Sequence, residues 1–135
     1  MEQLFCLMQS INSSTYIMEN INEGINLFNN SDYFSAHDFF EDLWMEADIE
    51  NRLFFQGLVQ VSVGSYHLLN NNLRGALNQY RKSVAKLKNY TPVYMNVQTG
   101  ILIEKVEILI SDLEKYFDEK INFVDINKIP KLEQI

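Results

Sequence analysis

Residues 21–40 read INEGINLFNNSDYFSAHDFF, and residues 61–80 read VSVGSYHLLNNNLRGALNQY. When the two stretches are aligned, small, apolar and turn-forming residues recur in register: Gly24 and Gly64, Phe28 and Leu68, Asn30 and Asn70, Tyr33 and Leu73, Ala36 and Ala76, Phe40 and Tyr80. A small residue lets two helices approach closely, and asparagine favours the turn that follows. The pattern therefore predicts two similar helical hairpins, like tetratricopeptide units but longer than their period of roughly 34 residues. Chance similarity between two ordinary hairpins is the alternative.

Apolar periodicity extends this expectation to the whole chain, which we predict to be all-α. The period predicts five helices, over about residues 15–29, 33–47, 51–69, 73–88 and 97–117. The third is apolar nearly all round, as a central helix is. We expect one domain over residues 1–135, with a motif-bearing core at about 15–90, a closing helix at 97–117 and an irregular, extended tail at 118–135.

Composition excludes several classes of protein. The 135 residues are 47% hydrophobic, enough for a core, and the formal charge of −7 disfavours general binding to nucleic acid. Some basic residues gather in the fourth predicted helix, where a solvated face is the simpler interpretation: Arg74, Arg81, Lys82, Lys86 and Lys88. We expect neither a secretory signal at the N-terminus nor a membrane span.

Residue usage also bears on the compartment. The lone cysteine, Cys6, cannot form an internal disulfide, which suits a reducing compartment. Abundant Asn, Ile and Lys hint at an AT-rich genome, bacterial or plastid. We therefore expect the cytoplasm, or the plastid stroma if the gene is plastid-encoded.

The repeat is broken at two positions that attract attention. His37 stands where the second repeat has Leu77, and Glu41 stands where it has Arg81. Leucine would serve as core at the first position, so packing alone does not require histidine there. Residues four apart share one helix face, which predicts that His37 and Glu41 lie side by side.

The third predicted helix carries a polar line of its own. Gln56, Gln60, Val63 and His67 follow one another at helical spacing, and Gly57 and Gly64 lie on the neighbouring line. A short connection at residues 48–50 should place the second and third helices antiparallel. We therefore predict that five polar side chains converge in a partly buried pocket between these helices: His37, Glu41, Gln56, Gln60 and His67.

Three interpretations of this cluster stay open. It is a satisfied core network, a pocket for a small ligand or partner, or a metal or catalytic site. Two imidazoles and a carboxylate (His37, His67 and Glu41) could chelate a divalent metal, and His37 backed by Glu41 is the plausible acid–base unit. The sequence has no HExxH motif, Gly-rich phosphate loop or CxxC pair.

Aromatic residues are dense in the same half of the chain. The inner stripe expected in the second helix consists of Tyr33, His37, Phe40, Trp44 and Ala47. Such a stripe is usually core. Phe34 and Phe39 fall partly off it, so these two could be exposed and mark an interface.

Taken together, these motifs resemble one family. Residues 33–44, YFSAHDFFEDLW, then residues 52–60, RLFFQGLVQ, then His67 and the NLRGA turn at residues 72–76 are similar to the bacterial, archaeal and plastid family known as domain of unknown function 309. The resemblance covers about residues 20–90, and Asp38 stands where the family often has glutamate. It implies an all-helical bundle with tetratricopeptide-like hairpins, and no activity. It singles out His37, Glu41, Trp44, Arg52, Gln56, Gly57, Gln60 and His67.

Two functions compete on these observations. The first is a helical module that binds a protein partner or a small molecule through the pocket, with His37, Glu41, Trp44, Arg52, Gln56, Gln60 and His67 as binding residues. The second is a metal-dependent or His/Glu acid–base enzyme, for example a hydrolase. The sequence identifies no cofactor and leaves a homo-oligomer open.

Overall fold

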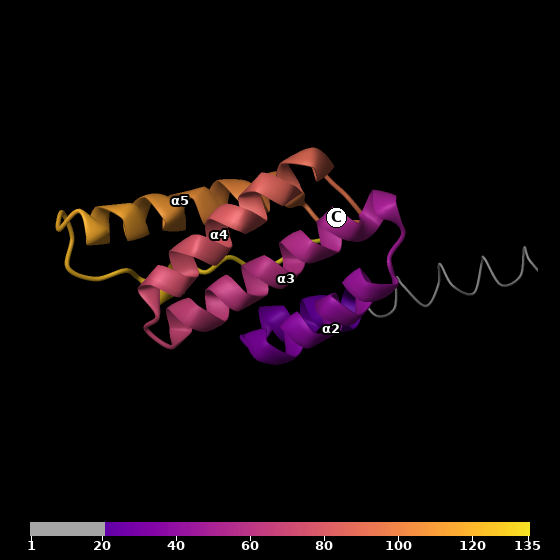
Figure 1. Cartoon of the computed structure of the whole chain (residues 1–135), viewed down its shortest axis with the longest axis horizontal. Helices are drawn as coiled ribbons and strands as arrows, with labels where there is room; N and C mark the ends of the chain where they lie inside the picture. The colour runs from indigo at the N-terminus through magenta and orange to yellow at the C-terminus, as the bar shows by residue number, and fades with distance from the viewer. Residues whose placement is uncertain (1–20) are drawn as a thin grey trace, which may run out of the picture.

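The computed structural model describes residues 21–135, in which the regular structure is helical (Figure 1). A helix runs over residues 21–29 and is followed by four helices and two short 3-10 turns: α2 (Tyr33–Glu46), α3 (Ile49–Leu69), α4 (Leu73–Leu87), η1 (Lys88–Tyr90), α5 (Thr99–Phe117) and η2 (Ile126–Lys128). The all-α prediction is confirmed. Cys6 and the part of the first predicted helix before residue 21 lie outside the described residues.

The two hairpins end their first helices in the same way, residue for residue. Ser31 and Asn71 both adopt a left-handed backbone, with φ of 65° and 61°. The next residues, Asp32 and Asn72, each donate their backbone N–H to the carbonyl five residues earlier, at 2.9 and 2.8 Å. Their side chains then accept from the N–H three residues on, at 3.3 and 3.0 Å. Each turn is thus a Schellman motif followed directly by an N-cap.

The helices of each hairpin pack through equivalent small residues. A Cβ atom added to Gly24 would lie 2.6 Å from the Phe40 ring, and one added to Gly64 would lie 2.9 Å from the Tyr80 ring. In the aligned repeats, Gly24 corresponds to Gly64 and Phe40 corresponds to Tyr80. The repeat seen in the sequence is therefore also a repeat in packing. α3 lies between α2 and α4, as a helix apolar on most sides should (Figure 1).

The buried face of α2 differs from the predicted stripe. Three of the expected residues are buried, namely Tyr33, Phe40 and Ala47. His37 and Trp44 are only half-buried, and Ala36 and Leu43 take the buried places instead. The reason is that α2 packs against two neighbours, the helix at residues 21–29 through Phe40 and α3 along its length. The face between these neighbours is centred on Ala36 and Leu43.

α5 begins at Thr99 rather than at residue 97, because the backbone of Val97 is already engaged. Its N–H donates to the Tyr94 carbonyl at 2.8 Å, and its carbonyl accepts from the Tyr94 N–H at 3.0 Å. Single antiparallel bridges join Val97 to Tyr94 and to Gln134, and neither extends into a strand. Within residues 21–135, the helices are therefore joined by loops and not by a sheet.

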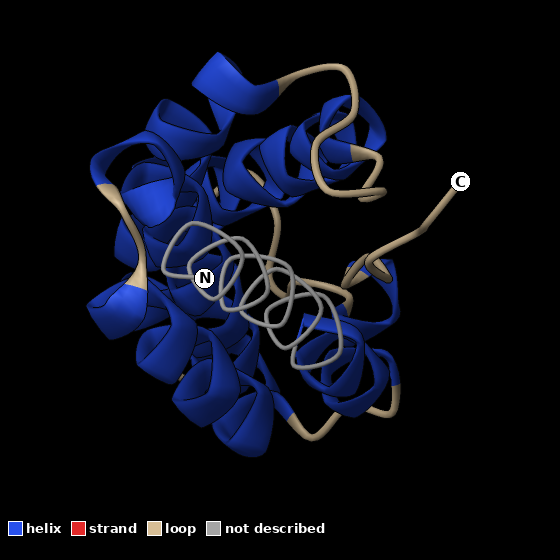
Figure 2. Ribbon diagram, turned by 90° about the vertical axis from the view of Figure 1, so that its right-hand side faces the viewer, coloured by secondary structure: helices blue, strands red, loops and turns tan. Residues whose placement is uncertain are grey.

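The tail after α5 is extended and returns along the molecule (yellow in Figure 1). The Lys128 ammonium lies 2.8 Å from a carboxylate oxygen of Asp112 on α5. Leu132 is buried, and Figure 2 shows this segment at the open side of the arc that the helices form. None of the helices described over residues 21–135 combines the length and the hydrophobicity that a membrane span needs.

Candidate functional site

His37 and Glu41 form the polar end of the candidate site on α2. The His37 Nε2 atom lies 3.0 Å from Glu41 Oε2, one helical turn away. His37 Nδ1 lies 3.2 Å from Asp38 Oδ1 and 3.1 Å from the Phe34 carbonyl oxygen. Both ring nitrogens therefore face oxygen atoms, and the ring is held in one orientation. The predicted pairing of His37 with Glu41 is what the structure contains.

A cavity of about 210 Å³ opens beside His37, between α2 and α3. Residues of both helices line it, three from each: Tyr33, Phe34, His37, Val63, Tyr66 and His67. Its wall is mostly carbon. The two histidines, which are far apart in the sequence, thus reach one cavity, as the antiparallel arrangement of α2 and α3 requires.

Two exposed aromatic side chains form the rim of this cavity. Phe34 is 55% exposed, Tyr66 is 39% exposed, and their ring centroids lie 5.8 Å apart in a tilted arrangement. Phe34 also lies 5.5 Å from the His37 ring. The prediction that Phe34 is exposed is confirmed, whereas Phe39 is half-buried. Exposed aromatic rings beside a cavity are common in surfaces that bind partners.

His67 is oriented by the turn that follows it. Its Nδ1 atom lies 3.3 Å from Asn72 Nδ2, and the oxygen of the same amide accepts from the Gly75 N–H at 3.0 Å. The amide nitrogen therefore donates and His67 Nδ1 accepts. This contact ties the cavity wall to the N-cap of α4, so the turn between α3 and α4 helps to shape the cavity.

The two glutamines do not join this cavity. Gln60 is buried and points to α4, where its Oε1 accepts from Lys86 Nζ at 3.0 Å. Gln56 is half-buried on α3 and is not part of the cavity wall. The expected convergence of five polar side chains is therefore wrong in this respect. The physical reason is that α3 has neighbours on two sides, and Gln60 faces α4 rather than α2.

The remaining residues singled out by the motif lie nearer the turn between α2 and α3. Trp44 is half-buried, and its indole Nε1 atom is buried without a hydrogen-bond partner among residues 21–135. Such an unsatisfied donor is unusual in a folded protein. Arg52 is exposed near the start of α3. Neither residue lines the cavity.

A set of possible metal ligands exists, but it differs from the predicted one. His37, Asp38 and Glu41 each offer a ligand atom, and the three atoms lie within 4.8 Å of one another. His67 does not belong to this set. All three groups come from one helix face, and Asp38 is exposed. In chemical terms the arrangement could hold a divalent cation at the surface or orient His37 as a base.

Tyr66 lines the cavity although the sequence pattern did not indicate it, and Val63 lines the cavity although it was placed on the polar line of α3 without being counted among the pocket residues. The signal was present, because Val63 and Tyr66 are three apart on α3, just as Phe34 and His37 are on α2. Facing pairs at this spacing on antiparallel helices enclose a common space. The prediction gave weight to the polarity of Gln56 and Gln60 and passed over the apolar and aromatic residues beside His67.

The sequence profile of a family described as Domain of unknown function (DUF309) matches residues 21–79. Over these residues the chain is similar to that family. The match spans both hairpin turns and all the residues that line the cavity. No curated protein matches the chain. The resemblance read from the motifs of α2 and α3 is thereby confirmed, and no activity comes with it.

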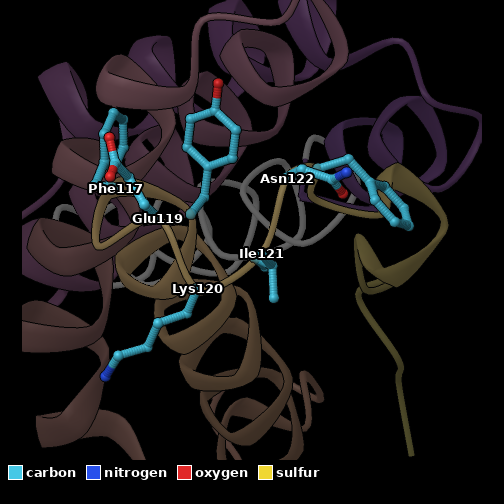
Figure 3. A pocket seen from close by; sticks show the side chains of 7 residues that line it. Phe117, Glu119, Lys120, Ile121 and Asn122 are labelled. Atoms are coloured by element: carbon cyan, nitrogen blue, oxygen red, sulfur yellow. The ribbon is translucent and has the colours of Figure 1, made fainter.

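A wider hollow of about 870 Å³ lies outside the matched residues 21–79, at the end of α5 (Figure 3). It is lined by one short stretch of the chain, from Tyr116 through Phe117 to Phe123. Arg74 stacks on the Phe117 ring beside it, 3.8 Å from the centroid. Because one short stretch forms this hollow and the motif residues are absent from it, the cavity between α2 and α3 is the better candidate site.

Proposed function

We propose that this chain is a protein-interaction module that receives one apolar side chain of a partner in the cavity between α2 and α3. The observation that supports this proposal most strongly is the cavity itself, which has a carbon-rich wall and an exposed rim of Phe34 and Tyr66. A groove between two helices that accepts an anchor residue is a common mode of peptide recognition.

The size of the cavity supports a side chain over a larger ligand. Pockets for drug-sized molecules and cofactors measure roughly 300–1,000 Å³. The cavity of about 210 Å³ falls below that range and suits one aromatic or large aliphatic group. A free small molecule with such a group is the variant of this proposal that its test must separate.

The charge around the cavity supports a basic partner. Asp38 and Asp42 are exposed on α2 and Glu41 is half-exposed, so carboxylates follow the same helix that carries Phe34 and His37. The whole chain carries a formal charge of −7. A segment with lysine or arginine beside its apolar anchor would be attracted by these carboxylates.

The test uses defined probes and nuclear magnetic resonance of the labelled chain. N-acetyl-tryptophanamide tests the cavity alone, and the tripeptide Lys-Trp-Lys with blocked ends tests the cavity together with the carboxylates. We expect both probes to shift the amide signals of Val63, Tyr66 and Phe34, with tighter binding by the tripeptide. Equal binding of the two probes would indicate a small apolar ligand instead. Absence of shifts at these amides up to millimolar probe would contradict the proposal.

Matched variants make the test specific. Val63→Trp should fill the cavity from its wall and abolish the shifts without removing the rim aromatics. Ile108→Ala removes an exposed apolar side chain of similar exposure on α5, 52% against 55% for Phe34, and should leave binding unchanged. Equal loss in both variants would indicate a general change of the fold.

A metal-dependent or acid–base function is the second candidate, and the cluster of His37, Asp38 and Glu41 is the observation that favours it. Elemental analysis of the purified chain and titration with Zn²⁺ test it directly. We would expect one bound ion that is lost in His37→Ala and kept in His67→Ala, since His67 lies outside the cluster. Weak binding that is equal in the wild type and in His37→Ala would remove this candidate.

A further inference from the structure

The segment 129–135, here called the strap, contacts the rest of the molecule as a bound peptide would, through backbone hydrogen bonds and a buried side chain. Within it, only Pro130 and Leu132 are buried, and Leu132 is 2% exposed. The strap lies against residues 21–29 on one side and against residues 96–105 on the other. It lies outside the DUF309 match, which ends at residue 79.

Asn29 clamps the backbone of the strap through both ends of its amide. The Leu132 N–H donates to Asn29 Oδ1 at 2.8 Å, and Asn29 Nδ2 donates to the Leu132 carbonyl at 3.0 Å. A side-chain amide that bonds both the N–H and the carbonyl of one residue can bind an extended backbone whatever side chain that residue carries. Two turns earlier on the same helix, Asn22 accepts from the Gln134 side chain at 2.9 Å.

On the other side of the strap, residues 96–98 bond the backbone of residues 133–135 as a neighbouring β-strand would. The Gln98 N–H donates to the Glu133 carbonyl at 2.8 Å, and the Ile135 N–H donates to the Asn96 carbonyl at 3.0 Å. Val97 and Gln134 form an isolated antiparallel bridge between these two bonds. Backbone pairing at one edge with a pocket for a single side chain is how strand-addition domains recognise extended peptides.

Besides the Gln134 amide, the surface beneath the strap contacts an apolar and a charged side chain. Leu132 fills the apolar site, and the Glu133 carboxylate lies 3.3 Å from the ammonium of Lys105 on α5. Beside the strap, a hollow of about 690 Å³ remains against α5, next to Ile108 and Pro130.

We propose that the surface beneath the strap, formed by residues 21–29 and 96–105, is a peptide-recognition groove. Residues 129–135 then act as an internal ligand of this groove. An extended segment of a partner protein, with a leucine followed by an acidic residue, replaces them. This groove is separate from the cavity between α2 and α3, so either proposal can fail while the other stands.

The test measures binding of a dye-labelled peptide, KIPKLEQI, to the full-length chain by fluorescence anisotropy. In the wild type the internal strap competes, so binding should be weak. Leu132→Ala removes the internal anchor, and this variant should bind the peptide at least tenfold more tightly than the wild type does. Adding Asn29→Ala to Leu132→Ala should abolish that gain, and so should replacing the leucine of the peptide with alanine.

A charge exchange keeps the proposal testable if Leu132→Ala does not fold. Lys105 is a half-exposed surface residue, so Lys105→Glu should leave the core intact while it repels Glu133 of the strap. This variant should bind KIPKLKQI several-fold more tightly than KIPKLEQI, and the wild type should show no such preference. Failure of both folded variants to bind their peptides up to millimolar concentration would overturn the proposal. Formation of dimers by Leu132→Ala or Lys105→Glu in place of peptide binding would overturn it as well, because the occupant would then be a second copy.

Discussion

Gly64 and Tyr80 meet so closely that a methyl group has no room between them. A Cβ atom on Gly64 would lie 2.9 Å from the Cδ1 atom and 3.0 Å from the Cε1 atom of the Tyr80 ring. The ring cannot easily move away, since it is buried and its hydroxyl bonds Ser65 Oγ at 2.9 Å. The contact between Gly24 and Phe40 is its equivalent in the first hairpin. These two contacts set the distance between paired helices.

The first prediction follows from this contact. Gly64→Ala should lower the free energy of unfolding by about 1–3 kcal/mol through overpacking, and Gly64→Leu should lower it further. Gly100→Ala is the matched control, because its Cβ atom would lie at an ordinary 3.5 Å from its nearest neighbour. Urea denaturation followed by circular dichroism measures both. Equal stability of Gly64→Ala and the wild type would show that the hairpins do not depend on this contact.

The second prediction concerns the bond between Ser65 and Tyr80. Tyr80→Phe leaves the buried Ser65 hydroxyl without its partner, which should cost about 1–3 kcal/mol of unfolding free energy. Ser65→Ala in the same background should recover part of that loss, because the orphaned hydroxyl is then gone. If the double variant is no more stable than Tyr80→Phe, the bond is not the source of the loss.

The third prediction is a dependence of stability on pH. Burial raises the pKa of Tyr80 well above the ordinary value of 10.0. A raised pKa in the folded state means that the contribution to stability is complete below pH 10 and is lost as the pH rises above it. The wild type should therefore lose more unfolding free energy between pH 9.5 and 11.5 than Tyr80→Phe does. Parallel stability curves for the two proteins would contradict this.

The architecture was largely predictable because its determinants are local. Asp32, Asp48 and Asn72 cap their helices with side chains that reach three residues ahead, and such caps are visible in sequence. The internal repeat, in which Gly24 aligns with Gly64, is also visible in the sequence and predicts both hairpins. Within residues 21–135, the helix ends consequently agree with the predicted ones to within about two residues.

The site was less predictable because it depends on which neighbours flank a helix. Gln60 shares a face with His67 in the sequence pattern, yet Gln60 contacts Lys86 of α4 and His67 lines the cavity beside α2. A central helix has two neighbours, and spacing alone does not say which side chain meets which. The contact between Asn29 and Leu132 joins residues 103 apart and has no local signal at all.

The fourth prediction concerns the pKa of Lys86, whose ammonium donates to Gln60. Burial, with a smaller contribution from the nearby Lys82 ammonium, lowers the pKa of Lys86 below the ordinary 10.5. A larger share of its amine is then neutral at mildly alkaline pH. Lys86 should therefore be acetylated by a limiting reagent at lower pH than Lys131, an exposed lysine on the strap, with mass spectrometry as the readout. Identical pH profiles for the two lysines would contradict the lowered pKa.

The central claim is that the cavity between α2 and α3 takes an apolar anchor from a partner. Selection from a displayed random peptide library on the wild type, with counter-selection on Val63→Trp, tests it most directly. The recovered peptides should share one large apolar residue with a lysine or arginine nearby. Tyr66→Ala should weaken their binding at least tenfold, while Ile108→Ala should leave it unchanged. Recovery of peptides that bind the wild type and Val63→Trp equally well would contradict the claim.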